Sequence, residues 1–459
     1  MIKTGYKIKA TRFTVAIILL CTTIGNLYAQ DSVKVLLLDD CIRIGLDQSA
    51  QILRSKDSVQ ISGAALMGAY GQFLPDLNFN GTPNYIAGKN LLTTTVPTLV
   101  NSRGLQMNYQ LTSTINIFNG FSNYSSLKAA TLSKSASEFN LDRVKQQIAF
   151  DVTQSFLQVI LDRRVVKSAT TNLAASTDRE AQLKELTGVG RNAVSDLYQQ
   201  EAETSSDKLF LIQSEDKLKN DIILLLRKIK ISQTDKYQIG DMAVDSTPFG
   251  AGYGSAQQLV DQAMKQRPDL KSSALNVSIA GWEIKNYQSG YLPKISLEGG
   301  IVSNGGYLNQ MYIDGINELG PQEPVGTALF GQFYGEIALD LSWHIFDRNY
   351  TKTNVAIAKI LQENAGIQYD DLSVQISSDI KQAYNDYLAA LQQIETANRG
   401  LFAAGEAFKV LQGKYDVGQA TFVELSTAQA VLLQAEVSKA QSDVNLALQK
   451  KIIDYYIGK

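Results

Sequence analysis

The side chains that most often build catalytic and metal centres are scarce in this sequence. Its 459 residues include one histidine, His344, and two cysteines, Cys21 and Cys41. A zinc site built from cysteine and histidine needs several such ligands, and a cysteine–histidine dyad needs both types in contact. The sequence shows no serine–histidine–aspartate arrangement and no phosphate-binding loop. We therefore predict a protein that is not an enzyme, with no catalytic residues, no metal ligands and no cofactor.

A strong charge of either sign is also missing. The 43 basic and 45 acidic residues give a net charge of -2. Proteins that bind nucleic acid usually carry a basic domain or stripe, so no nucleic-acid partner is expected. Apolar residues make up 44% of the chain and charged residues 19%, which is enough for a packed core and excludes a largely disordered chain.

Long apolar runs are absent after the N-terminal segment, which has the layout of a secretory signal. The apolar stretch 13–21 precedes a small residue, Ala29, at a suitable cleavage position, and four basic residues lie ahead of it, Lys3, Lys7, Lys9 and Arg12. We expect residues 1–29 to be a signal peptide. A lipoprotein signal is disfavoured because Leu20, rather than a small residue, precedes Cys21. No later stretch approaches the roughly 18 apolar residues of a transmembrane helix.

Cleavage at this position leaves Cys41 as the only cysteine of the mature chain. An intrachain disulfide is then impossible, although the protein is exported to an oxidising compartment. We expect Cys41 to lie in a short helix near the mature N-terminus and to act as a small core residue.

The mature sequence repeats one plan. Three motifs of the first half recur in the same order in the second: Phe73-Leu-Pro as Tyr291-Leu-Pro, Ile117-Phe-Asn as Ile345-Phe-Asp, and Val189-Gly as Val417-Gly. The duplication predicts a first repeat over residues 30–230 and a second over 255–459, each with a short helix, two strands and a long helical hairpin. Residues 231–254 are expected to be a linker on the outside of the helices. The second copy is longer between residues 305 and 324, and we expect a loop there because loops absorb insertions.

Two segments alternate apolar and polar residues. They run from Leu105 to Ile117 and from Phe333 to Ile345, about 13 residues each, and His344 falls on the polar side of the second. A tilted strand of about 9 to 11 residues crosses a bilayer, so both are predicted to be membrane strands. Shorter partner strands are expected near 77–80 and 295–298, where prolines stand at the start.

Proline is missing from residues 98–247 and 325–459, where the apolar period becomes helical. The stripe of Ile148, Val152, Phe156 and Ile160 has a counterpart in Ile376, Ile380, Tyr384 and Leu388. A helix over 121–186 would be on the order of 100 Å long. Glycine-containing turns at 188–190 and 413–418 would then lead into returning helices over 197–230 and 422–456, which gives two long helical hairpins.

Four membrane strands cannot close a barrel or hide their edges in lipid. Several chains must therefore share one barrel, and three chains would supply twelve strands, an even number within the range of outer-membrane barrels. Long helices continuous with these strands would extend the lumen across a periplasm-sized distance. The sequence thus predicts a mainly α-helical protein with a transmembrane β-barrel that acts as a conduit.

These duplicated motifs resemble the TolC-like outer-membrane efflux proteins over nearly the whole mature chain. The resemblance implies a homotrimer, with a twelve-stranded barrel in the outer-membrane lipid of a Gram-negative cell and an α-helical tunnel in the periplasm. It implies an exit duct of a tripartite efflux or type I secretion system that receives substrates from a periplasmic adaptor and an inner-membrane pump. The alternatives are a trimeric outer-membrane adhesin, whose strands would lie together at the C-terminus, and a coiled-coil structural protein, which would leave the alternating strands without a purpose.

The hairpin tips are the candidate functional sites. We expect the adaptor to dock on exposed backbone there, around Val189, Gly190 and Arg191 and around Val417, Gly418 and Gln419, because glycine permits close approach and a helix end leaves polar groups unpaired. The resemblance places the closed end of the tunnel at the same tips. Asp196, Tyr415 and Glu424 would form the periplasmic gate, with Tyr415 hydrogen-bonded to Asp196. The alternative is that both acids only cap helices, since Thr421 and Glu424 fit a capping box.

Overall fold

The computed structural model describes residues 34–92, 98–232, 237–241, 254–313, 316–317 and 323–458. The chain divides into two compact units: residues 1–49, 148–248 and 389–449 form the first, and residues 50–147, 249–388 and 450–459 form the second. Each unit therefore contains parts of both sequence copies. The expected signal peptide, residues 1–29, lies outside the described residues.

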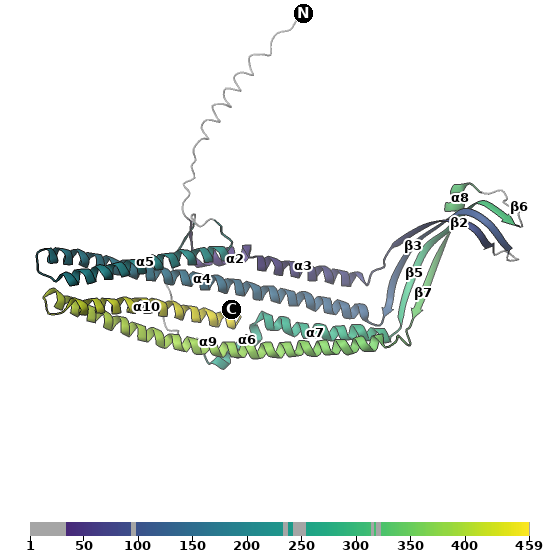
Figure 1. The fold of residues 1–459 in the computed structure, drawn as a ribbon. Coiled ribbons are helices and arrows are strands. Elements are labelled where there is room, and N and C mark those ends of the chain that lie inside the picture. The colour runs from purple at the N-terminus through teal and green to yellow at the C-terminus, as the bar shows by residue number, and fades with distance from the viewer. Residues whose placement is uncertain are drawn as a thin grey trace, which may run out of the picture. The chain divides into compact units, whose positions relative to one another are not determined.

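The second unit contains an antiparallel sheet in the order β2–β3–β5–β7 (Figure 1). Its strands are β2 (Asn78–Leu92), β3 (Thr98–Asn119), β5 (Lys294–Ile313) and β7 (Phe333–Ser342). The expectation of two short partner strands is wrong, because β2 has 15 residues and β5 has 20. Pro83 interrupts the donor pattern of β2, which an edge strand tolerates.

Two further expectations about this sheet are corrected. The segment 305–324 is not a simple loop: β5 extends to Ile313, the short β6 (Ile316–Asn317) pairs back on it, and the helix α8 (Val325–Phe330) follows. Strand β7 ends at Ser342, so His344 lies beyond it. Past this point Arg348 and Asn349 adopt positive φ, and Asp347 accepts a hydrogen bond from the Thr351 amide (2.8 Å) at the start of the next helix.

The long helices occur where the absence of proline predicts them. Helices α4 (Ser122–Gly188) and α9 (Tyr350–Asp416) have 67 residues each, and the returning helices α5 (Val194–Lys228) and α10 (Phe422–Tyr456) have 35 each. The shorter helices before the strands also match in length, α2 (Leu38–Gln48) with α6 (Ala256–Gln266) and α3 (Ala50–Gly71) with α7 (Pro268–Gln288). The two copies are thus nearly equal in helical length.

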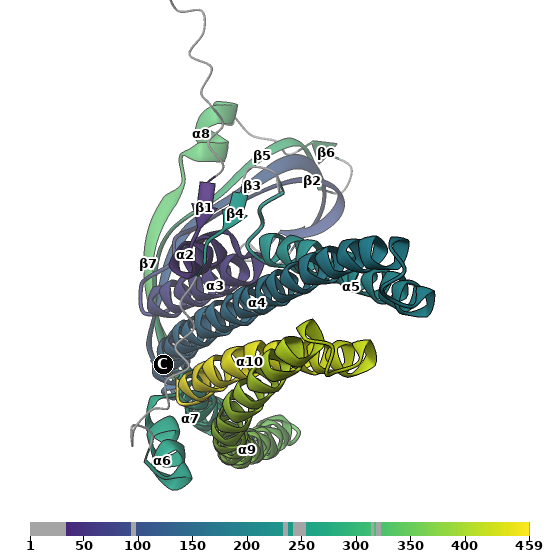
Figure 2. The same ribbon diagram turned by 90° about the vertical axis from the view of Figure 1, so that its left-hand side faces the viewer.

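A small sheet organises the core of the first unit. Strand β1 (Lys34–Leu36) pairs in parallel with β4 (Tyr237–Ile239), which lies inside the segment expected to be a linker (Figure 2). The Arg163 guanidinium of α4 holds this strand by donating to the carbonyl of Gly240 at 3.2 Å. Cys41 is fully buried in the same cluster, which confirms its expected role as a core residue.

Candidate functional site: the hairpin tips and the faces of the sheet

Both hairpin tips have the same backbone geometry. Gly190 and Gly418 each adopt φ of 75°, in the left-handed region that favours glycine. At the first tip the Arg191 amide donates to the carbonyl of Leu186 at 2.8 Å and the Gly190 amide donates to that of Thr187 at 3.0 Å. The second tip repeats both bonds, from Gln419 to Lys414 at 2.7 Å and from Gly418 to Tyr415 at 2.9 Å. This pair of hydrogen bonds is the Schellman motif that ends many helices.

The tip geometry corrects the expectation that unpaired backbone amides face the periplasm. The amides of Gly190, Arg191, Gly418 and Gln419 all donate within their own turn. What each tip exposes instead is an apolar side chain, because Val189 is 71% exposed and Val417 is 68% exposed. A partner at the tips would therefore contact side chains rather than free amides.

The two acidic residues beyond the tips lie in different environments. Glu424 accepts from the Thr421 amide at 2.7 Å, and the Glu424 amide donates to the Thr421 hydroxyl at 3.3 Å. These reciprocal bonds form the predicted capping box of α10. The bond from the Thr421 amide, followed by the one from its hydroxyl, lowers the pKa of Glu424. Helix capping is thus a sufficient role for this residue.

Asp196 has no such cap to close. The residue ahead of α5 is Ala193, which has no side-chain acceptor, and the Asp196 carboxylate accepts from the Ser195 hydroxyl at 3.4 Å. Tyr415 shares a side-chain hydrogen bond with Asn192, not with Asp196. Burial raises the pKa of Tyr415, and the charge of Asp196 adds to the increase. Within one chain, Tyr415, Asn192 and Asp196 therefore form a cluster. Asn192 is the member of this cluster that the sequence did not predict.

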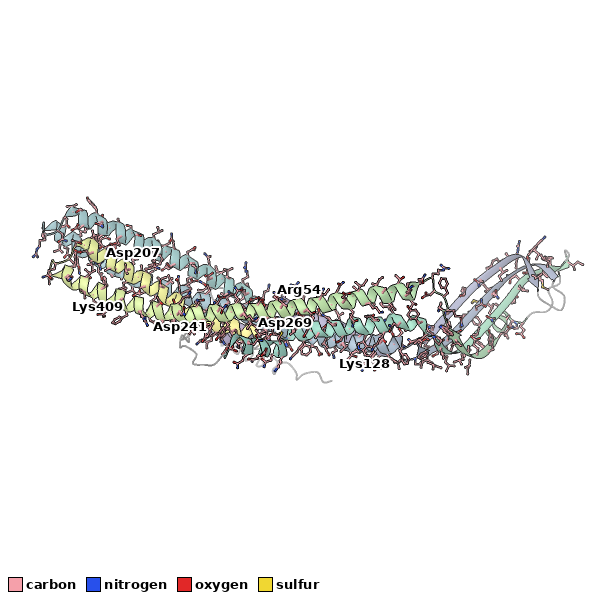
Figure 3. The ribbon with its side chains drawn as sticks, turned by 90° about the horizontal axis from the view of Figure 1, so that it is seen from below. Arg54, Lys128, Asp207, Asp241, Asp269 and Lys409 are labelled. Carbon is pink, nitrogen blue, oxygen red and sulfur yellow. The ribbon has the colours of Figure 1, made fainter. Side chains whose placement is uncertain are left out.

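A second polar network links the two hairpins of one chain, and it was also missed. Arg179 of α4 is 8% exposed and donates to Gln429 of α10, whose amide donates to Asn172 at 2.8 Å. On α5, Asp207, whose position is labelled in Figure 3, accepts from the Ser176 hydroxyl, and Glu203 accepts from Ser426 at 2.5 Å. Arg179 lies on the same buried face of α4 as Ser176 and Leu183. A charged residue on a buried helix face was the signal in the sequence that could have predicted this network.

The faces of the sheet differ in polarity. Directly opposed residues of an antiparallel pair lie on the same face, and the register places Phe79 opposite Leu111 and Leu111 opposite Ile301. This face carries exposed apolar side chains across all four strands: Phe79, Leu111, Leu297, Ile301, Ile337, Leu339 and Leu341. The opposite face is polar and includes Gln110, Thr112, Thr114, Glu298, Glu336 and Asp340. An apolar surface of this extent is suited to lipid. No helix within the described part of the chain is long and apolar enough to cross a membrane.

Comparison with known proteins gives a family for this architecture. Residues 259–452 match the family model of the outer membrane efflux proteins. The outer membrane efflux protein BepC of Brucella suis biovar 1 is 21% identical over 399 residues, which cover 86% of this chain and 79% of BepC. The chain is thus similar to the TolC-like outer-membrane efflux proteins. These relatives are proteins of the outer membrane.

Solved structures show the same fold for this chain. The outer membrane protein VceC of Vibrio cholerae superposes with a TM-score of 0.75 at 13% identity, over 92% of this chain and 96% of VceC. The outer membrane channel CmeC of Campylobacter jejuni gives a TM-score of 0.74 at 16% identity, over 92% of this chain and 85% of CmeC. These relatives are channels and efflux proteins rather than enzymes.

Proposed function

We propose that three copies of this TolC-like chain close one twelve-stranded barrel and form the exit duct of a tripartite efflux or type I secretion system. The observation that carries the proposal is the four-stranded sheet with one apolar face. Within the described residues, β2 pairs only with β3 along its length, and β7 pairs only with β5. Open edges have no water to bond in hydrocarbon, so another copy must pair with them.

The arrangement of the strands also favours a duct over an adhesin. The strands form two pairs, and the hairpin of α4 and α5 lies between them in the sequence. An adhesin anchor would need its strands together at the C-terminus. In the proposed duct, every pair of strands instead continues into a long helix, which extends the lumen into the periplasm.

Cysteine cross-linking across the open edges tests the trimer. Asn80 on β2 and Asp340 on β7 lie on the two outer strands of the sheet and on its polar face. A chain with both Asn80→Cys and Asp340→Cys should form a covalent trimer under oxidation, and neither single variant should do so. Native mass measurement of the unmodified protein in detergent should give three copies. A stable monomer with an intact barrel would contradict the proposal.

The hairpin tips are the proposed docking site of the periplasmic adaptor, which would connect the duct to an inner-membrane pump. Val189 and Val417 are two exposed apolar side chains at equivalent positions, flanked by Arg191 and Gln419. A helical adaptor could bury both. The family resemblance supports the same location.

Substituting both valines tests the docking site. The double variant Val189→Asp with Val417→Asp should lose export while trimer formation and membrane insertion remain, because a charge would be buried against the adaptor. The matched double variant Val189→Thr with Val417→Thr keeps the shape and should retain most export. Full export by the aspartate variant would place the adaptor contact elsewhere.

Asp196, Tyr415 and Glu424 remain the proposed periplasmic gate. The cluster of Tyr415, Asn192 and Asp196 supports this role, because it connects the end of α9 with the start of α5. Glu424 supports it less, since its hydrogen bonds go to Thr421. We therefore assign the stronger gating role to the first tip.

A further inference from the structure

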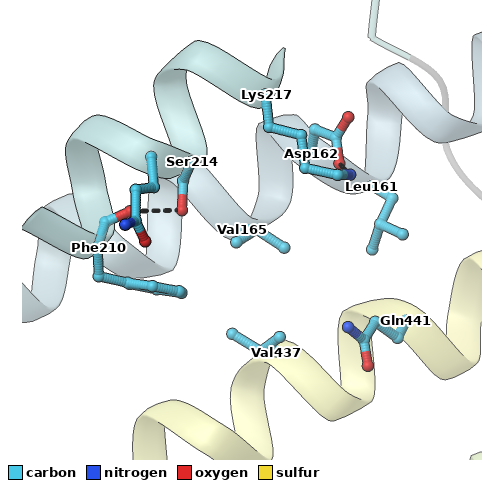
Figure 4. A pocket seen from close by; sticks show the side chains of 9 residues that line it. Leu161, Asp162, Val165, Phe210, Ser214, Lys217, Val437 and Gln441 are labelled. Atoms are coloured by element: carbon cyan, nitrogen blue, oxygen red, sulfur yellow. Dashed lines mark hydrogen bonds and ion pairs between the residues drawn. The ribbon is translucent and has the colours of Figure 1, made fainter. Parts of the chain in front are cut away.

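A cavity of about 270 Å³ lies in the first unit between α4, α5 and α10. Figure 4 shows Asp162 and Lys217 together at one end and Phe210 at the other, with Val437 and Gln441 of α10 facing them. The apolar part of the wall consists of Leu161, Val165, Phe210 and Val437. The cavity therefore has one charged end and one apolar end.

Asp162 is the unusual side chain of this wall. Its side chain is only 3% exposed, and its Oδ1 accepts from Gln158 at 3.0 Å and from the Lys217 ammonium. The other oxygen, Oδ2, is buried and has no hydrogen-bond donor among the described residues. A buried acceptor without a donor is unfavourable, so Asp162, which lines the cavity, favours a donor that can approach this oxygen.

The charges near Asp162 do not balance. Lys217 lies between two carboxylates, since its Nζ also approaches Asp221 at 3.5 Å. Two negative charges thus share one positive charge, and α10 contributes only the neutral Val437 and Gln441 to the wall. Burial raises the pKa of Asp162 to about 6, and Asp221 adds to the increase because the two carboxyl groups can share a hydrogen bond only when one is protonated, whereas Lys217 opposes it. The site accommodates one more cation or one more proton.

We propose that this cavity is a binding site for a small organic cation, a primary ammonium group on an apolar body. The ammonium would donate to Asp162 Oδ2, and the apolar body would lie against Val165, Phe210 and Val437. Neither an anionic nor a neutral molecule of the same shape satisfies both the free acceptor and the missing charge. This inference goes beyond the proposed duct and does not depend on it, because binding needs no adaptor and no pump.

Three fluorinated probes of one shape test the proposal on the purified full-length protein in detergent by fluorine NMR titration. They are 4-fluorophenethylamine, 4-fluorophenethyl alcohol and 3-(4-fluorophenyl)propionate. We expect the amine to bind at least about tenfold more tightly than the other two, which corresponds to about 1.4 kcal/mol. Equal affinity for the alcohol would overturn the proposal, because a merely apolar cavity would not distinguish them.

Two variants with opposite expected effects keep the test decisive. Asp162→Asn should weaken binding of the amine about tenfold, whereas the matched control Asp216→Asn should leave it unchanged, since Asp216 is an exposed acid of α5 bonded to Asn220 at 3.1 Å. Lys217→Met should tighten binding of the amine, because it removes the competing cation. If Asp162→Asn does not fold, an unchanged or weaker affinity in Lys217→Met overturns the proposal.

The pH dependence gives an independent readout. The amine stays protonated below pH 8, whereas Asp162 gains a proton as the pH falls through about 6. The affinity of the cavity for the amine should be roughly tenfold lower at pH 5 than at pH 7.5, because only about a tenth of the Asp162 carboxyl groups stay ionised one unit below their pKa. The Asp162→Asn variant should lose this dependence. A wild-type affinity that does not change with pH would contradict a role for the carboxylate.

Discussion

The two hairpin tips of this chain share a backbone and differ in how their returning helices begin. Gly190 and Gly418 have the same φ and the same pair of capping bonds. Beyond them, α10 begins with Thr421 and Glu424 in a closed capping box, whereas α5 begins after Ala193, which cannot cap. Duplication therefore preserved the turn, and the acid beyond it took different partners in the two copies.

This difference distinguishes two roles for the acids, helix capping and contact between the hairpins, which the sequence alone does not distinguish. The hydrogen bonds of Glu424 are made inside its own helix start. Asp196 instead acts on Tyr415, which belongs to the other hairpin and is bonded to Asn192. Asp196 is thus free to interact with the other hairpin because its side chain does not cap α5.

The largest expected effect concerns what the tips share. Gly190→Ala and Gly418→Ala should each destabilise the protein by about 1 to 2 kcal/mol, because a side chain disfavours the left-handed backbone although space is open around both glycines. Thermal unfolding of the purified protein measures the loss. Gly413→Ala, inside α9 with open space, is the control and should be neutral or stabilising. Unequal losses at the two tips would show that the turns are not equivalent.

The two acids beyond the tips should contribute differently to stability, although the two turns are alike. Glu424→Ala should destabilise the protein through loss of the capping box, and Asp196→Ala should destabilise it less, because only its interaction with the helix dipole is lost. Denaturant unfolding compares the two variants.

Installing the missing cap sharpens the same comparison. Ala193→Thr should stabilise the first tip by about 0.5 to 1 kcal/mol, because it supplies the side-chain acceptor that Thr421 provides in the second. It should also draw Asp196 into a capping box. No gain in unfolding free energy would mean that the start of α5 cannot adopt the geometry seen at α10.

The cluster between the hairpins should govern conductance. Tyr415→Phe removes the hydrogen bond to Asn192, a loss of roughly 0.5 to 1.5 kcal/mol in each chain, and should raise conductance in planar bilayers. Asp196→Ala should act in the same direction, and Glu424→Ala should raise conductance less than either. If both Tyr415→Phe and Asp196→Ala, alone and combined, conduct like the unmodified protein, these residues only stabilise helix ends.

The smallest effect is a pH dependence confined to the second tip. The folded pKa of Glu424 is lowered, so the stability it contributes is present above its ordinary value of 4.5 and is lost as the pH falls through the folded pKa. The protection factors for hydrogen exchange at the start of α10, which correct for the pH dependence of intrinsic exchange, should therefore fall below about pH 4.5. The Glu424→Gln variant should show a flat profile over that range, and an unchanged profile would assign the dependence to another group.

The helices were predictable because their signals are local and repeated. The long stretch without proline and the stripe through Val152 and Phe156 predict α4 to within two residues at either end, and the counterpart stripe through Ile376 and Ile380 predicts that α9 exists. The ends of the strands were less predictable, because Pro83 and the glycines of β5 interrupt the alternation that identifies a strand. Strand β4 was missed, since three residues carry no readable period.

The candidate site divides in the same way. Thr421 and Glu424 could be identified as a capping box because the motif lies within four residues. The bond between Tyr415 and Asn192 and the one between Arg179 and Gln429 join residues more than two hundred positions apart. Only the tertiary structure decides such partners.

Cys41 has a consequence for the chemistry of assembly. Its thiol is fully buried, and burial, with the charge of Asp40 adding to it, raises its pKa to about 11. Disulfide exchange and alkylation require the thiolate, so the folded chain is inert toward periplasmic oxidants and the unfolded chain is not. Cys41 is the only cysteine among the described residues, so it can report when folding is complete. An alkylating reagent added during maturation modifies Cys41 only in chains in which α2 has not yet docked.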